Sequence, residues 1–132
     1  MGHGRHRWRG GPPEGAAPRR IDGFLEPCLL LLLHQRQSHG YELLEGLAPF
    51  GFGQNPVDLS TVYRLLRHLE MHGLVTSQWD TAGHGPARRV YQITEAGEAY
   101  LQRWVADLRE TDRVLHHFLQ VYDKRLGRGE ES

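Results

Sequence analysis

The chain has little cysteine, no long hydrophobic run and no net charge, and each of these absences excludes some classes of protein or of binding site. Its 132 residues include one cysteine, Cys28, which excludes an intrachain disulfide and a zinc site built from several thiolates. Cys28 stands between Pro27 and Leu29 in an apolar run, where a thiol is expected to be inert. No run approaches the roughly 18 apolar residues of a membrane span, and no secretory signal pattern is present. We therefore expect no membrane association and a cytoplasmic location.

The absence of net charge hides an uneven distribution along the chain. The 16 basic and 16 acidic side chains cancel, but residues 1–20 carry five arginines and one glutamate, which makes them +4 and the remainder −4. This segment is rich in Gly, Pro, Arg and His and has no apolar periodicity, so we predict a disordered basic arm. Two roles stay open for it, an inert tail or an arm that follows the DNA backbone.

The sequence also lacks a catalytic constellation. No nucleophile-elbow context surrounds Ser60 or Ser77, no phosphate-binding glycine loop is followed by a lysine, and the carboxylates are scattered. We therefore expect neither an enzyme nor a cofactor.

Histidines raise the question of a metal. A spacing of four residues on a helix can bind zinc, and a second pair follows; the residues are His68 with His72, and His116 with His117. No nearby thiol or carboxylate completes a site of three or four ligands, so we expect no bound metal. A metal-responsive repressor remains an alternative.

Two helices are predicted in the first half of the folded part. The first begins near Pro27, which the first turn tolerates, and continues until the breakers at Ser38 and Gly40. It is apolar on nearly every face, so it needs partners all round, and we expect a second subunit to be one of them. The second helix follows a turn and ends before Gly51, with one apolar stripe formed by Tyr41, Leu44, Leu47 and Ala48.

A third helix and a hairpin follow the loop GFGQNPVD. Asp58 or Ser60 can cap this helix, whose buried stripe is expected to be Val62, Leu65, Leu66 and Leu69. The segments LVTSQWD and RRVYQIT, separated by TAGHGPA, predict a β-hairpin. We expect the tip to carry His84, Arg88 and Arg89 into solvent, and one face to pack on the helices through Val75, Trp79, Tyr91 and Ile93.

The last predicted helix runs from about Glu95 to Lys124 and is capped by Thr94. Its apolar residues repeat every seven positions, with Leu101, Leu108, Leu115 and Tyr122 at one position and Trp104, Thr111 and Phe118 at another. At 1.5 Å per residue this helix extends roughly 45 Å, so its outer half needs a partner. The alternative is a helix folded back on its own domain.

These elements predict a mainly α fold with a small β-hairpin, in the α+β class. A winged helix-turn-helix of residues 21–94 is followed by a long dimerisation helix, residues 95–125, and by a disordered tail, residues 126–132. The major groove of DNA admits a helix and the neighbouring groove admits the tip of a β-ribbon, so we expect a DNA-binding regulator.

Four segments, SHGYELL, STVYRLLRHLEMHGLV, GPARRVYQIT and TEAG, resemble in order and spacing the signature segments of PadR-type winged-helix transcriptional regulators. The resemblance covers roughly residues 21–123. It implies a homodimer held by the N-terminal helix and the long C-terminal helix, which usually represses transcription until a small molecule or another signal loosens it. The short C-terminal helix is similar to the compact branch of the family, and the basic arm lies outside the shared pattern.

The resemblance also implies which residues face DNA. The recognition helix corresponds to Leu59 through His72, and the helix before it begins near a phosphate. The DNA-binding candidates are His39, Tyr41, Ser60, Thr61, Tyr63, Arg64, Arg67, His84, Arg88 and Arg89. Because helix side chains read base edges while phosphate contacts fix the register, Arg64 is expected to carry more sequence information than Arg88.

The remaining candidates concern the dimer and an effector. The residues expected to hold two subunits together are Leu29, Leu32, Leu101, Trp104, Leu108, Leu115, Phe118 and Tyr122. Aromatic side chains that can line a cavity for a small aromatic effector are Phe24, Tyr100 and Trp104. The leading hypothesis is a homodimeric, ligand-responsive repressor on a pseudo-palindromic operator. The alternative from another class is a winged-helix protein-interaction module without sequence-specific DNA binding.

Overall fold

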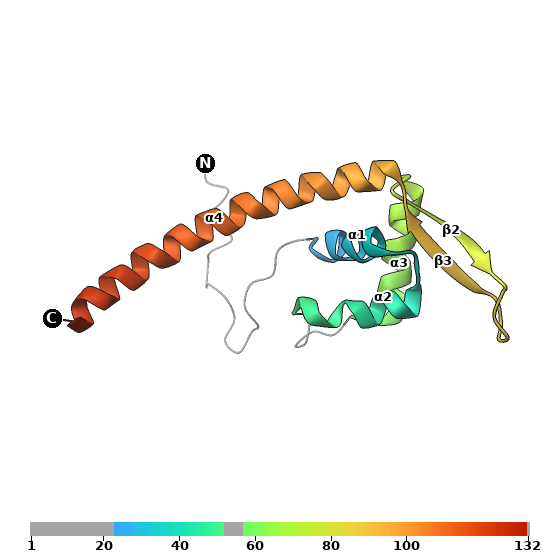
Figure 1. Cartoon of the computed structure of the whole chain (residues 1–132), viewed down its shortest axis with the longest axis horizontal. Helices are drawn as coiled ribbons and strands as arrows, with labels where there is room; N and C mark the ends of the chain where they lie inside the picture. The colour runs from blue at the N-terminus through green and yellow to red at the C-terminus, as the bar shows by residue number, and fades with distance from the viewer. Residues whose placement is uncertain (1–22, 52–56, 132) are drawn as a thin grey trace.

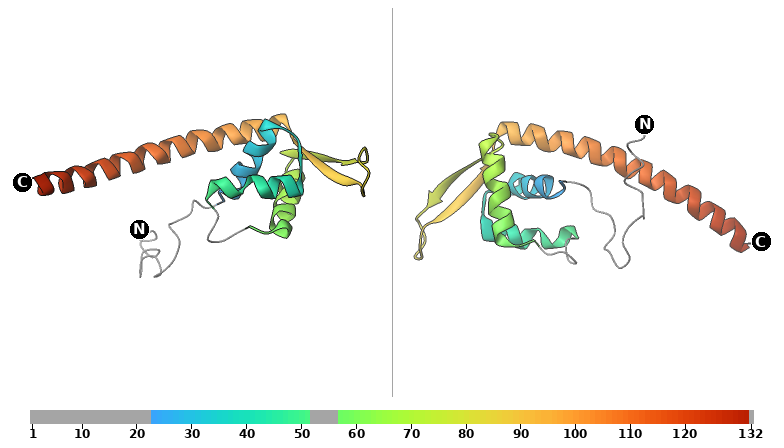
Figure 2. Two further views of the ribbon diagram at one scale, coloured as in Figure 1. Left: turned by 60° about the horizontal axis from the view of Figure 1, so that its bottom comes forward. Right: turned by 180° about the vertical axis from the view of Figure 1, so that it is seen from behind.

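Four α-helices and a small antiparallel sheet make up the computed structural model, which describes residues 23–51 and 57–131, with side chains to residue 125. The elements are α1 (Leu25–Gln35), β1 (Ser38–His39), α2 (Gly40–Gly46), the 3-10 turn η2 (Ala48–Phe50), α3 (Leu59–Met71), β2 (Val75–Asp80), β3 (Arg88–Ile93) and α4 (Glu95–Glu131). The hairpin β2–β3 and the outer half of α4 project from opposite sides of the cluster formed by α1, α2 and α3 (Figures 1 and 2). The basic arm expected at residues 1–20 lies outside the described residues, as do residues 52–56.

The predicted fold class is confirmed, with one strand added. The hairpin has the expected register, from Val75 opposite Ile93 to Asp80 opposite Arg88. The two residues of β1 pair with the other edge of β3, Ser38 opposite Tyr91, so the sheet has the order β1-β3-β2. Sequence reasoning took this segment for a turn, since two residues are too short to show an alternating pattern.

The core lies where α1 packs against α2, β3 and the start of α4, and the buried face of α3 belongs to the same cluster. Leu29 and Leu30 are fully buried, and the buried face of α2 runs through Gly40, Leu43 and Leu47. The expected α2 stripe was wrong at its two ends, because Tyr41 and Ala48 are exposed. Burial also raises the pKa of the only thiol, Cys28, to about 12, so this thiol stays protonated at neutral pH.

Helix α3 follows its sequence pattern closely. Asp58 caps its N-terminus, with the Oδ1 atom accepting a hydrogen bond of 2.8 Å from the backbone N–H of Thr61. Val62, Leu66 and Leu69 are fully buried, and Leu65 is partly buried. The opposite face of this helix is therefore free to meet a ligand.

Helix α4 is joined to the sheet by the single residue Thr94. The Thr94 hydroxyl donates to the carbonyl of Gly73 at 2.7 Å and accepts from the backbone N–H of Gly97 at 3.0 Å. The Thr94 N–H donates to the carbonyl of Leu74 at 3.0 Å. These bonds hold the start of α4, the end of β3 and the turn after α3 together, and they confirm the predicted helix cap.

Beyond its first turns α4 leaves the domain. Leu101 is buried against the core, but every residue described from Arg109 onward is exposed. The alternative of a helix folded back on its own domain was wrong, as Figures 1 and 2 make plain. The helix continues to Glu131, so residues 126–131 are helical where a disordered tail was expected. Nowhere in 23–51 or 57–131 does a helix combine the length and apolar character that crossing a bilayer demands.

Candidate nucleic-acid interface

A groove of about 470 Å³ runs between the start of α2, the outer face of α3 and the wing, as we name the hairpin β2–β3. It is lined by His39, Tyr41, Tyr63, Arg67, Glu70, Trp79, Ala87, Arg88, Arg89 and Tyr91. The sequence had predicted that six of these ten residues face DNA. The structure thus brings together side chains from three separate segments of the chain.

The exposed face of α3 carries further candidates beside the groove. Ser60, Arg64 and Arg67 are exposed and lie at helical spacing on the side opposite the buried leucines. Thr61 is half-buried at the edge of this face, and its N–H is used in the helix cap. His84 is exposed in the loop at the tip of the wing, away from the groove lining.

Tyr63 fixes the spacing between α2 and α3. A Cβ atom on Gly40 would stand 2.6 Å from the Tyr63 ring, so only glycine allows the ring to lie against the start of α2 at this distance. Tyr63 is half-buried and is one of the residues that line the groove.

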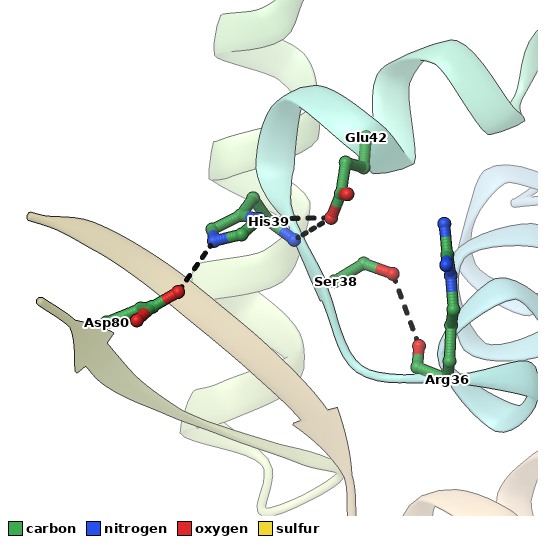
Figure 3. Close-up of polar contacts among 5 residues, drawn as sticks. All are labelled: Arg36, Ser38, His39, Glu42 and Asp80. Carbon is green, nitrogen blue, oxygen red and sulfur yellow. Dashed lines mark hydrogen bonds and ion pairs between the residues drawn. The ribbon is translucent and has the colours of Figure 1, made fainter. Parts of the chain in front are cut away.

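His39 connects α2 to the wing (Figure 3). Its backbone N–H donates to Glu42 Oε1 at 2.9 Å, and its ring Nδ1 lies 3.0 Å from the same oxygen. The buried Nε2 has no hydrogen-bond partner among the described residues and lies at an ion-pair distance of 3.4 Å from Asp80 Oδ2. His39 is therefore placed between two carboxylates from different elements.

Both carboxylates around His39 favour their charged forms. The hydrogen bond from the His39 backbone N–H lowers the pKa of Glu42. The backbone N–H of Ala82 donates to Asp80 and lowers the pKa of Asp80, with smaller contributions from His39 and Arg88. This end of the groove thus combines negative and positive side chains, whereas Arg64 and Arg67 on α3 face solvent.

The two wing arginines have different surroundings. Arg88 is exposed, whereas Arg89 is half-buried and its Nε donates to Ser77 Oγ at 3.0 Å. The Ser77 hydroxyl in turn donates to Glu70 Oε2 at 2.9 Å, which links the wing to α3. The Arg89 guanidinium lies 4.9 Å from the centroid of the Trp79 ring.

Trp79 corrects a prediction. It was expected to pack against the helices, but it is 61% exposed, on a hairpin that projects from the helical cluster (Figure 1). Sequence reasoning therefore missed Trp79, Ser77 and Glu70 as groove or network residues. The hairpin register could have indicated this cluster. It places Trp79 directly opposite Arg89, and Ser77, two residues before Trp79, lies on the same face of the hairpin.

The outer half of α4 presents one apolar face. The large apolar side chains between residues 114 and 122 are 48–64% exposed; they are Val114, Leu115, Phe118, Leu119, Val121 and Tyr122. We call this set the α4 seam. Three of the expected dimer residues belong to it, and Trp104 and Leu108 continue the same face as partly buried residues.

Two residues that were expected at the dimer interface are instead buried within one chain. Leu29 is fully buried and Leu101 is 6% exposed, both in the core of this one chain, in contrast to the expected contact with a second copy. Leu32 is half-buried, and its side chain packs beside Gly46 of α2.

The aromatic candidates for an effector site divide into two groups. Tyr100 and Trp104 line an open hollow of about 410 Å³ together with Arg103, Ala106 and Asp107. The Tyr100 hydroxyl donates to Glu26 Oε1 of α1 at 3.0 Å. Phe24 instead packs edge-to-face on Phe50, with 6.5 Å between the ring centroids, and does not line this hollow.

The histidines form contacts but no metal cage in the part of the chain described. The rings of His68 and His72 lie 4.4 Å apart, and His68 Nε2 is 3.7 Å from Glu26 Oε2. Among residues 23–51 and 57–131, no three His, Cys, Asp or Glu side chains gather where they could hold a metal ion. His116 and His117 are exposed on α4.

Comparison with known proteins places these features in a family. The family model described as the transcriptional regulator PadR-like family matches residues 29–103. A PadR-like transcriptional regulator from Bacillus cereus strain ATCC 14579 is 28% identical with a TM-score of 0.66, and the match covers 74% of this chain and 93% of that one. A conserved protein of unknown function, described as a potential transcriptional factor, is 32% identical with a TM-score of 0.66, covering 89% of this chain and all of its own.

Another solved structure is that of Bacillus subtilis PadR in complex with operator DNA. It is 23% identical with a TM-score of 0.56, and the match covers 65% of this chain and 48% of that protein's. This likeness concerns the fold.

Proposed function

The chain belongs to the PadR-like family of transcriptional regulators, and from this premise we propose that it acts in the cytoplasm as a homodimeric repressor that binds a pseudo-palindromic operator. The observation that carries the proposal is the exposed face of α3, with Ser60, Arg64 and Arg67, beside a wing that bears the exposed Arg88. A helix of this kind fits the major groove, and a hairpin beside it reaches the neighbouring backbone. The Bacillus subtilis protein that shares this fold was solved in complex with operator DNA, which supports DNA as the partner in this proposal.

The homodimer is supported by the α4 seam. These large apolar side chains stand free of their own domain and are exposed to water. Pairing with the identical row of a second copy would remove this apolar surface from water. Two-fold pairing would present two recognition helices to successive major-groove segments of one duplex, which matches a pseudo-palindromic site.

Ligand response is the finer part of the proposal. Tyr100 and Trp104, which line the open hollow, fall by helical spacing on the side of α4 that carries the seam, so we expect a second copy to lie beside the hollow. An aromatic compound bound there would contact both rings and stand next to the Tyr100–Glu26 hydrogen bond that ties α4 to α1. We infer that such a compound weakens operator binding by changing how α4 meets the winged helix.

The competing class, a protein-interaction module, predicts no binding to duplex DNA. In our proposal the protein performs no catalysis, and its chemistry is the recognition of DNA by charge and shape. The exposed arginines of α3 favour DNA over a protein partner, because they stand on the one face of this helix that the core leaves free.

The test compares two arginines. A duplex is selected from a random pool by the full-length protein, and binding is titrated across salt concentrations for Arg64→Ala and Arg88→Ala. We expect Arg64→Ala to lose sequence preference, with about 1–3 kcal/mol of discrimination removed at one base pair. Arg88→Ala should weaken all duplexes alike and reduce the salt slope by about 0.9. If the wild type retains no duplex even in low salt, the proposal fails.

A further inference from the structure

Trp79 is a large, exposed aromatic side chain in a groove whose other lining residues include three arginines, three tyrosines and one glutamate. It is 61% exposed, and the groove around it also holds Arg67, Arg88 and Arg89. An exposed tryptophan costs solvation free energy in the free protein, so its position among cations calls for a reason.

Arg89 and its hydrogen-bond partners hold the ring in place. The Arg89 guanidinium stacks on Trp79 at 4.9 Å, and Arg89 itself is anchored through Ser77 to Glu70 of α3. Successive side chains of a strand point to opposite faces, so Ser77 and Trp79 share one face of β2. Arg89 lies directly opposite Trp79 on the antiparallel strand β3 and shares the same face. A ring fixed in this way loses little conformational entropy when it meets a ligand.

The same contacts occupy Arg89. Its guanidinium is half-buried, bonded to one hydroxyl and stacked on one ring, whereas its neighbour Arg88 is exposed. A phosphate contact requires a cation that is free to reach the DNA backbone. The exposed Arg88 meets this requirement, whereas the Arg89 side chain is held by Ser77 and Trp79.

We propose that Trp79 contacts DNA directly, with its ring packed against the apolar C–H edges of deoxyribose in the backbone beside the groove. Arg89 is a positioning residue that orients this ring. The charge of the groove is complementary to phosphates, and the sugars between phosphates are the apolar surface that such a backbone offers to an indole. This assignment rests on the proposed function and adds an uncharged contact at the wing.

The salt dependence of binding separates an apolar contact from a charged one. Each phosphate contact contributes about 0.9 to the slope of log K against log salt, and an indole contributes nothing. The duplex selected by the wild-type protein is titrated against Trp79→Ala, Trp79→Phe and Arg89→Ala, with Arg88→Ala as the matched control from the adjacent position. Thermal unfolding is measured for each variant.

We expect Trp79→Ala to weaken binding about tenfold with an unchanged salt slope, the loss that follows when one ring face is withdrawn from contact. Trp79→Phe should recover most of that loss. Arg89→Ala should cause a similar loss with little change in slope, and the double variant should be no weaker than either single one, because the two residues act as a unit.

A slope that falls in Trp79→Ala as much as in Arg88→Ala would mean that Trp79 acts only through a charge, and the proposal would be wrong. Unchanged affinity in Trp79→Ala would mean that the ring makes no contact with DNA, and it would also overturn the proposal. Either result leaves the proposed function standing as long as Arg64→Ala and Arg88→Ala behave as expected.

Fluorescence supplies a second readout that does not depend on affinity. The chain has three tryptophans, so replacing Trp8 and Trp104 by phenylalanine leaves Trp79 as the single emitter. Its emission should change on titration with the selected duplex and should be shielded from iodide in the complex. Equal iodide quenching with and without DNA would overturn the contact.

Discussion

Phe118 offers the sharpest test of the α4 seam. A phenylalanine side chain presents roughly 200 Å², and Phe118 is 64% exposed, which leaves about 130 Å² for a second copy to cover. At about 25 cal/mol per Å² this amounts to ~3 kcal/mol per protomer and ~6 kcal/mol for a two-fold dimer. Replacement by alanine removes most of that contact, so the dimer dissociation constant should rise about 10³- to 10⁴-fold.

The measurement is sedimentation equilibrium over a wide range of protein concentration. Gln120 lies two residues further along, on the other side of α4, so Gln120→Ala is the matched control and should leave the dimer intact. Far-UV circular dichroism checks that α4 remains helical in both variants. If Phe118→Ala dimerised as tightly as Gln120→Ala, Phe118 would not be buried between two copies and the seam would not be the dimer interface.

Two further predictions concern stability. Gly97→Ala would place a Cβ atom 2.1 Å from the backbone carbonyl oxygen of Leu74, which cannot move aside, so we expect a loss of about 2–3 kcal/mol, seen in chemical unfolding. Gly83→Ala, with nothing within 4 Å of its Cβ, should be nearly neutral in the same assay. For Asp58, the hydrogen bond from the Thr61 N–H lowers the pKa below its ordinary value of 3.8, so the cap stabilises the fold above that pH and is lost as pH falls through the lowered value. The Tm difference between wild type and Asp58→Ala should therefore shrink on acidification from about pH 5 to about pH 2; a constant difference would contradict this assignment.

Local pattern was enough to predict the helices and the hairpin. In α3 the apolar spacing of Val62, Leu66 and Leu69 identified the buried face, and Asp58 identified the start. Both signals depend only on residues within a few positions of each other, so neither needed knowledge of the rest of the fold.

The parts that sequence reasoning missed depend on distant partners. β1 exists because Ser38 and His39 meet the free edge of β3, more than fifty residues away. The exposure of Trp79 depends on how far the hairpin extends past the helices, which strand alternation does not encode. The exposed candidates of the site, such as Arg64, follow from helix periodicity, whereas the connection from Arg89 through Ser77 to Glu70 required the packing of the wing on α3.

Thr94 allows little bending between the wing and α4. Because one residue joins β3 to α4 and three hydrogen bonds fix it, the helix and the strand should rotate as one rigid lever. A helix of 37 residues extends about 55 Å, so a tilt of about 5° displaces its far end by about 5 Å. Conversely, a compound that changes the crossing angle of two such levers would shift both hairpins along the duplex, without any need to unfold the recognition helices.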